Sequence, residues 1–164
     1  MLSNKLTMLR IGALVVSAIL VSGTTMAADT PDPGLVTLSS AHSVRDTIDR
    51  FDGAVRQKGW VVFTEIDHAA AAAAVGMPLR ARTVVLFGNP QAGTPAMQKY
   101  PTLALDLPMR VLIWEDDQGG VFITRSTGAD VTSRVFARHG VVLPPQASQS
   151  TEAVLNDFTR QAAQ

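Results

Sequence analysis

The chain has 164 residues, no cysteine, and 14 Lys plus Arg against 14 Asp plus Glu. A chain without cysteine has no disulfide, no cysteine for a lipoprotein anchor and no thiolate metal ligand. The balanced charge gives no electrostatic reason to bind nucleic acid or anionic lipid, so neither is an expected partner.

The first 27 residues have the order of a secretory signal peptide. Lys5 and Arg10 come first, the run Ile11 to Val21 carries no charge, and small residues lead up to Ala27. This order predicts cleavage near Ala27 and a periplasmic or secreted mature protein without a stable membrane anchor. The alternative is an uncleaved anchor, for which the apolar stretch is short.

The mature chain is expected to form one domain. Residues 28–34 include two prolines and a glycine, and we interpret them as a flexible leader to a single domain of residues 35–164. A first strand is expected over 35–38. Ser43 has the residue type of an N-cap, and apolar residues recur behind it at helical spacing up to Gly59, which predicts a helix.

Two strands and a short helix are expected next. The β-branched and aromatic residues of 60–66 predict a strand, and Asp67 is placed to cap an alanine-rich helix over 68–75. The continuous apolar run 83–87 is typical of a buried central strand.

Turn-forming residues follow that strand. We interpret residues 88–93 as a loop, because they include two glycines, an asparagine and a proline. Thr94 and Pro95 have the residue types of an N-cap and a first helical turn, so a short helix is expected to begin there.

The C-terminal part predicts a hairpin and two helices. Strands are expected over 109–115 and 121–124, followed by a helix over 131–139 that ends at Gly140. The last helix is marked by apolar residues at helical spacing, namely Val154, Leu155, Phe158 and Ala162. The principal order is β-α-β-β-β-β-α with short inserted helices, and the fold class is α+β.

Five segments carry a resemblance to a known family. They are Ile66-Asp67-His68, Phe87 to Met97 (FGNPQAGTPAM), Asp106-Leu107-Pro108, Trp114-Glu115-Asp116 and Arg138-His139-Gly140. From about Val44 onward the chain resembles the domain of unknown function 302 (DUF302) family. The resemblance implies two layers: a curved antiparallel sheet of the TATA-binding-protein type, and helices on one face. The chain departs from the family pattern at Arg125 and Gly128, where a Tyr and then a Pro are usual.

The candidate site lies where two strands pass into helices. Because the strands that end near residues 66 and 87 should share one sheet, we expect the side chain after the first to approach the loop after the second. The candidate ligand-binding residues are His68, Asn89, Gly93, Thr94 and Met97.

Two interpretations of the loop 88–94 stay open. It has the glycine spacing of a phosphate-binding loop but lacks the lysine, so a nucleoside triphosphate is not expected, whereas free amides there would suit a small anion. Alternatively, Gly88, Asn89 and Gly93 only satisfy backbone geometry, with Gly93 at positive φ.

Chemistry beyond binding has little support in the sequence. The three histidines show no H-x3-H or HExxH spacing, so no metal site is expected. No serine lies in a GxSxG elbow, and no residue can be named as catalytic or as cofactor-binding.

Three functional hypotheses stay open. The first is a non-enzymatic module that binds a small molecule, and the second is a small hydrolase or isomerase with His68 as general base. The third is a structural domain that forms a homodimer through a sheet edge or a helix face.

Overall fold

The computed structural model describes residues 34–164, and the expected signal peptide lies outside them. A five-stranded antiparallel sheet has the strand order β1-β5-β4-β3-β2. The strands are β1 Leu35–Ser40, β2 Val61–Asp67, β3 Arg82–Gly88, β4 Met109–Glu115 and β5 Val121–Ser126. The α+β class and the expected order of principal elements are confirmed.

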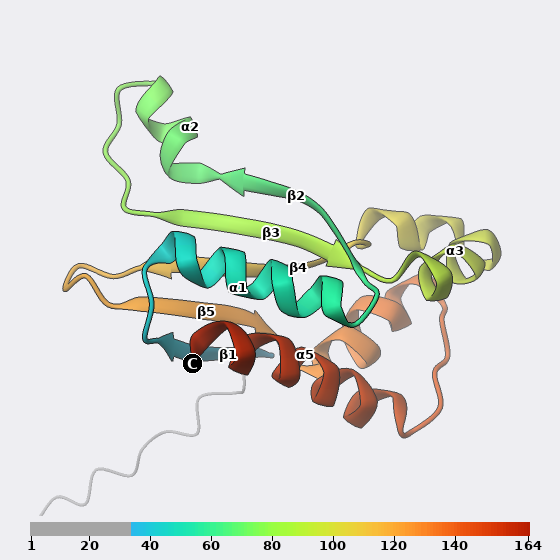
Figure 1. Ribbon diagram of the computed structural model, residues 1–164. Helices are drawn as coiled ribbons and strands as arrows, with labels where there is room; N and C mark the ends of the chain where they lie inside the picture. The colour runs from blue at the N-terminus through green and yellow to red at the C-terminus, as the bar shows by residue number, and fades with distance from the viewer. Residues whose placement is uncertain (1–33) are drawn as a thin grey trace, which may run out of the picture. The chain divides into compact units, whose positions relative to one another are not determined.

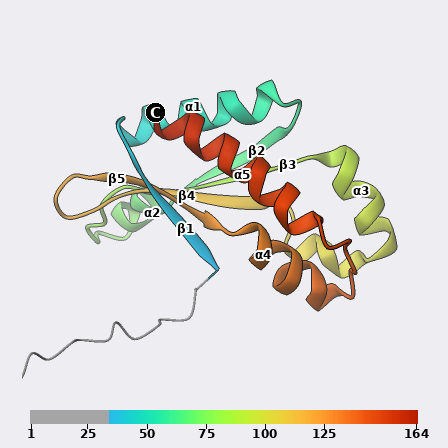
Figure 2. The ribbon, with the colours of Figure 1, turned by 90° about the horizontal axis from the view of Figure 1, so that it is seen from below.

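Helices α1 and α5 lie side by side over one face of the sheet (Figures 1 and 2). The shorter helices lie at the ends of the strands, and α4, η2 and η3 follow one another as one continuous helical stretch. The helices are α1 Val44–Gln57, α2 His68–Ala74, α3 Pro90–Lys99, η1 Pro101–Leu105, α4 Gly128–Asp130, η2 Val131–Phe136, η3 Ala137–His139 and α5 Ala147–Ala163.

The sequence signals at the ends of α1 and α2 act as expected. Ser43 Oγ accepts a hydrogen bond from the Asp46 amide at 3.1 Å, and Gly59 has φ +74° just beyond α1. Asp67 Oδ1 accepts from the Ala70 amide at 3.0 Å and caps α2.

Aromatic rings fill the centre between the helices and the sheet. Phe51 of α1 meets Phe87 of β3 edge to face at 5.0 Å, and Phe158 of α5 packs on both. Trp60 lies 5.4 Å from Phe158, at the start of β2. The core therefore extends to the end of the sheet at which β3 passes into α3.

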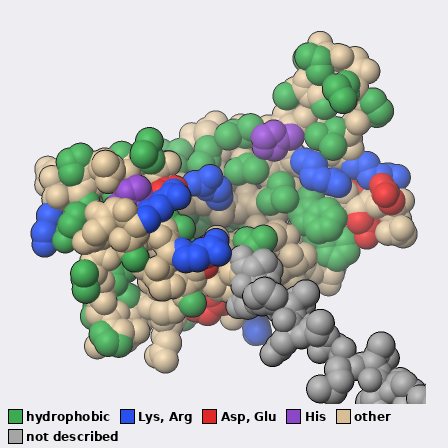
Figure 3. Space-filling model, turned by 180° about the vertical axis from the view of Figure 1, so that it is seen from behind, with side chains coloured by type: hydrophobic (Ala, Val, Ile, Leu, Met, Phe, Trp, Pro, Cys, Tyr) green, Lys and Arg blue, Asp and Glu red, His purple; other side chains and the backbone are tan. Residues whose placement is uncertain are grey.

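The opposite face of the sheet is not covered by helices, and Figure 3 shows hydrophobic side chains gathered on it. Trp114 stacks on Phe122 with ring centroids 4.8 Å apart, and the Arg82 guanidinium lies over the Trp114 ring. The Trp114 indole N–H donates to the Thr124 hydroxyl at 2.9 Å, so its polar atom is satisfied.

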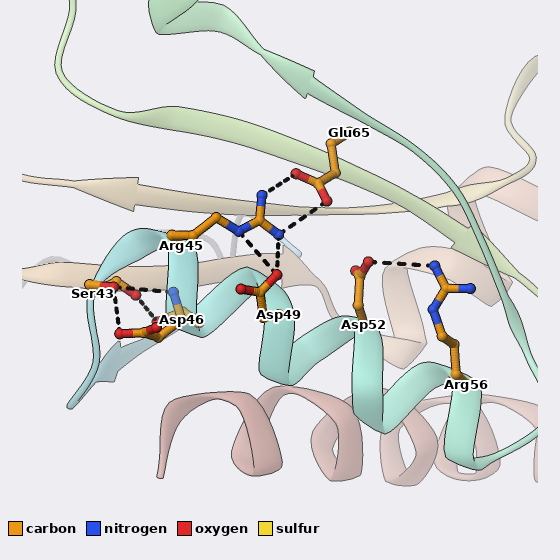
Figure 4. A network of polar contacts seen from close by, with 8 residues as sticks. Ser43, Arg45, Asp46, Asp49, Asp52, Arg56 and Glu65 are labelled. Carbon is orange, nitrogen blue, oxygen red and sulfur yellow. Dashed lines mark hydrogen bonds and ion pairs between the residues drawn. The ribbon is translucent and has the colours of Figure 1, made fainter.

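A polar network ties α1 to β2 (Figure 4). Arg45 donates to Glu65 at 2.8 Å and also bonds Asp49, and these two carboxylates raise its pKa. Asp52 lies further along α1, and burial raises its pKa, with the Glu65 carboxylate adding to the effect.

The expected loop over 88–93 is wrong. Helix α3 starts at Pro90, because Asn89 and Pro90 supply the N-cap and the N1 proline one turn earlier than Thr94 and Pro95 would. Pro95 instead lies inside the helix, where it lacks the N–H that would reach back to Gln91.

Candidate functional site

An apolar cavity of about 500 Å³ lies where α3, the start of β4, η2 and α5 meet. We call it the α3 cavity. Its walls are mostly hydrophobic, and no charged side chain lines it. The lining residues are Trp60, Phe63, Gly88, Asn89, Pro90, Ala92, Gly93, Ala96, Met97, Leu107, Pro108, Met109, Val131, Phe136, Val141, Leu143, Ser150, Thr151, Val154 and Leu155.

Small residues on α3 leave room for this cavity. Ala92, Gly93 and Ala96 follow one another at helical spacing and all line it. A Cβ built on Gly93 would lie 3.7 Å from Leu107 Cδ1 and 3.9 Å from Met97 Cε, which is ordinary contact. The spacing of small residues on α3 is a sequence signal that the loop interpretation missed.

Asn89 holds the start of α3 rather than leaving its amides free. The Asn89 side-chain oxygen accepts from the Gln91 amide at 3.0 Å and from the Ala92 amide at 3.4 Å. The Gly93 amide donates to the Asn89 carbonyl at 2.8 Å. The amides expected to suit an anion are therefore already bonded within the chain.

Three of the five predicted binding residues line the α3 cavity, namely Asn89, Gly93 and Met97. Thr94 is exposed on α3 and does not line it. The expected positive φ of Gly93 is wrong, because this residue lies within the helix and its φ is not positive.

His68 lies at the other end of the β2–β3 hairpin, and its expected approach to Asn89 is wrong. Val61 pairs with Gly88, whereas Asp67 pairs with Thr83. Six residues of strand at about 3.3 Å each separate the two ends by about 20 Å. The strands share a sheet, as expected. Because they are antiparallel, the last residue of β2 and the last residue of β3 lie at opposite ends of the hairpin.

A buried ion pair lies beside the α3 cavity. Arg125, only 2% exposed, donates to both carboxylate oxygens of Glu152 and to Asn156. Glu152 also accepts from the Gly128 amide at 2.6 Å. Arg125 and this amide hold the pKa of Glu152 below its usual range. A cavity of about 50 Å³ next to Arg125 shares Leu107 and four other apolar lining residues with the α3 cavity.

A second polar cluster joins η1 to η3. It unites two of the segments that carry the family resemblance, the one with Asp106 and the one with Arg138 and His139. Asp106 accepts from Arg138 and from the His139 ring, whose other nitrogen lies 3.0 Å from the Thr102 hydroxyl. Arg138 holds the pKa of Asp106 below its usual range, and His139 adds to this. The hydroxyl of Thr102, the imidazole of His139 and the carboxylate of Asp106 follow one another as in a catalytic triad. Thr102 lines neither of the two cavities. We therefore interpret the cluster as a structural contact that holds η3 against η1.

Residues 34–164 contain neither a cluster of metal-binding side chains nor a membrane-spanning helix. No group of three or more His, Asp or Glu side chains gathers there in a way that would hold a metal ion. Over the same residues, no helix has the length and apolar character needed to cross a membrane.

The match to known proteins covers most of the described domain. A model of the domain of unknown function DUF302 matches residues 36–157. The chain belongs to the DUF302 family. The expected departures from the DUF302 pattern, Arg125 and Gly128, are the two groups that bind Glu152 in the buried ion pair.

A solved DUF302 structure shares the fold. It is the crystal structure of an uncharacterized conserved DUF302 protein from Bacillus stearothermophilus, with a TM-score of 0.58 and 13% sequence identity. The match covers 80% of this chain and 94% of that one. At this identity the likeness shows the fold alone.

Curated relatives match over a shorter region. The chain is 45% identical over 103 residues to "Fluoride-specific ion channel FluC 1" of Brucella suis and to the protein of that name in Brucella abortus. The match covers 63% of this chain, and 41% and 38% of those two proteins. Because it spans about two fifths of those proteins, their names describe more than the part shared with this DUF302 chain.

Proposed function

We propose that this DUF302 domain is a non-enzymatic module that binds an apolar small molecule in the α3 cavity. The supporting observation is the cavity itself, about 500 Å³ with hydrophobic walls and no charged lining. Pockets for small ligands commonly span about 300–1,000 Å³ and have this kind of lining. The size and the walls therefore suit a drug-sized hydrophobic molecule.

The lining defines the chemistry of the ligand. A charged group placed in the cavity would lose its hydration without gaining a partner, so the buried part of the ligand is uncharged. Asn89, Ser150 and Thr151 are the polar side chains of the lining, and the Asn89 oxygen already caps α3. Met97 and Met109 add flexible walls, which adapt to ligands of different shape.

One further part of the proposal rests on the sequence, and another on the strand pairing. The order of residues 1–27 supports export to the periplasm or beyond, which would give the module ligands from outside the cytoplasm. The enzyme hypothesis has less support, because His68 lies about 20 Å from the cavity end of the hairpin.

The test uses N-phenyl-1-naphthylamine, a neutral apolar probe, and the tryptophan beside the cavity. The chain has two tryptophans, so Trp114→Phe leaves Trp60 as the reporter. We expect energy transfer from Trp60 to saturate as the probe binds. In the same background Ala96→Phe fills part of the cavity and should weaken binding at least tenfold.

The matched control is Gln98→Phe, which adds the same ring to an exposed position of α3 outside the cavity. We expect this variant to bind the probe as the parent does. Melting curves followed by circular dichroism establish that both variants fold. Unsaturable binding, or equal affinity of the two phenylalanine variants, would contradict the proposal.

A further inference from the structure

Strand β2 is an edge of the sheet with few of the features that prevent edge pairing. It carries no lysine and no proline, and of its seven side chains only that of Val62 is partly buried. Figure 1 shows no strand beyond β2, and α2 rises from the end of β2 on the side away from β3. Natural edge strands are usually protected by lysine, proline or a covering segment, and here a bulge at Phe63 is the one irregularity.

Exposed hydrophobic side chains concentrate on β2 and the segment after it. Of the large hydrophobic side chains exposed within residues 34–164, six of nine lie between Val61 and Leu79. Val75 is 72% exposed and Met77 64%, and α2 has no buried residue. Such a concentration is typical of a surface that another protein covers.

We propose that a second copy of this chain covers this surface, with the two β2 strands paired antiparallel about a two-fold axis. The backbone N–H and C=O groups on the outer side of β2 can form hydrogen bonds with another strand. Under a two-fold axis, the same edge strand of each copy forms the interface. The charges on β2 favour a second copy of this chain over a basic protein. A basic protein would need free carboxylates on β2, but Glu65 already pairs with Arg45 and Asp67 already caps α2.

The acidic side chains select one register. Centring the axis on Glu65 would set this residue opposite its own copy, and centring it on Ile66 would set Glu65 opposite Asp67. Like charges directly opposite one another destabilise a strand pair. Centring the axis on Thr64 places the two threonines opposite each other and Asp67 opposite Val61, so no two carboxylates face.

This pairing places residues of the partner beside the α3 cavity. Trp60 and Phe63 line the cavity from the start of β2, and Phe63 is 52% exposed. In an antiparallel pair the end of one β2 lies beside the start of the other, so the partner's His68 would come beside Trp60. Asn89 follows β3, two strand spacings or about 10 Å away. Within one chain His68 lies about 20 Å from Asn89. In the dimer the partner's His68 takes the nearer position.

Dimer formation through β2 does not depend on ligand binding in the α3 cavity. The test therefore contains no ligand, and its outcome is independent of the proposed function. The chain has no cysteine, so each engineered cysteine is unique. The full chain is expressed with its own N-terminus as the Thr64→Cys variant, purified and then oxidised. We expect a disulfide-linked dimer, because opposed Cβ atoms lie about 4.5–5.5 Å apart and a shift of about 1 Å brings them to the separation of about 3.5–4.5 Å that a disulfide requires.

Ser39→Cys is the matched control, since Ser39 is an exposed residue of β1, the other edge strand. It should cross-link at least tenfold more slowly. Mixing Val61→Cys with Asp67→Cys should yield the mixed dimer in preference to either self-linked form, which tests the register. Thr64→Lys brings two cations together at the axis and should weaken the dimer at least tenfold in sedimentation velocity. A monomer at all concentrations, or equal cross-linking of Thr64→Cys and Ser39→Cys, would overturn the proposal.

Discussion

Asn89→Ala separates the two interpretations of the loop before α3. The Asn89 side chain caps α3 through the amides of Gln91 and Ala92, at 3.0 and 3.4 Å. Loss of an N-cap side chain costs about 1 kcal/mol. In a domain of this size 1 kcal/mol lowers the melting temperature by about 4 °C. We therefore expect Asn89→Ala to fold, with a free energy of unfolding lower by about that amount.

Urea unfolding followed by tryptophan fluorescence measures the change. Asn89→Asp and Asn89→Ser both retain a capping oxygen and should recover most of the lost stability. N-phenyl-1-naphthylamine affinity, measured where all variants are folded, should change little, because the Asn89 oxygen is engaged by the helix. A variant with unchanged stability that no longer binds the probe would refute the capping role and assign Asn89 to the ligand.

Three further substitutions test the local geometry. Gly93→Ala should raise the melting temperature, because the added Cβ makes ordinary contacts and a helical glycine costs up to about 1 kcal/mol relative to alanine. Gly128→Ala should lower the free energy of unfolding in urea by about 3 kcal/mol or more, since its Cβ would lie 2.3 Å from the Ser148 carbonyl oxygen. Arg138 lowers the pKa of Asp106, so this carboxylate stabilises the fold above its unfolded pKa of about 4, and the contribution is lost as the pH falls through the lower folded pKa. Asp106→Asn should flatten that part of the acid unfolding curve.

Local signals predicted most of the elements correctly. The Ser43 cap, the apolar spacing of α1 and the glycine after it all act within a few residues, so the sequence contains the whole interaction. The loop 116–120 between β4 and β5 is similar, since Asp116 accepts from the Gln118 and Gly120 amides. The start of α3 was missed because two adjacent pairs, Asn-Pro and Thr-Pro, both have the residue types of a helix start.

The candidate site was predicted only in part, because a cavity depends on distant segments. Asn89, Gly93 and Met97 were found from residue type near one strand end, and they line the cavity. Its remaining walls come from the starts of β2 and β4, from η2, from residues 141–143 and from α5, which no local pattern brings together. His68 was misplaced by the direction of β2 relative to β3, and strand direction is a property of the whole sheet.

Arg125 and Gly128, the two expected departures from the DUF302 pattern, both bind Glu152. A double-mutant cycle tests whether Arg125 and Glu152 act as a unit. Glu152→Gln leaves Arg125 buried without a counter-ion, although the Gly128 amide keeps an acceptor. Removing one partner of a buried pair costs about 3–5 kcal/mol, and we expect about 3 because the Glu152 side chain is 35% exposed.

Arg125→Met removes the buried cation, so adding Glu152→Gln to it should cost far less than Glu152→Gln alone. Urea unfolding of the parent, both single variants and the double variant gives the coupling energy, which we expect to be about 1–3 kcal/mol. The matched control pair is Arg80→Met with Glu115→Gln, a more exposed ion pair that should show a smaller coupling. Additive effects of Arg125→Met and Glu152→Gln would show that the pair does not act as a unit. The arginine expected to depart from the family pattern at residue 125 would then need an explanation outside this contact.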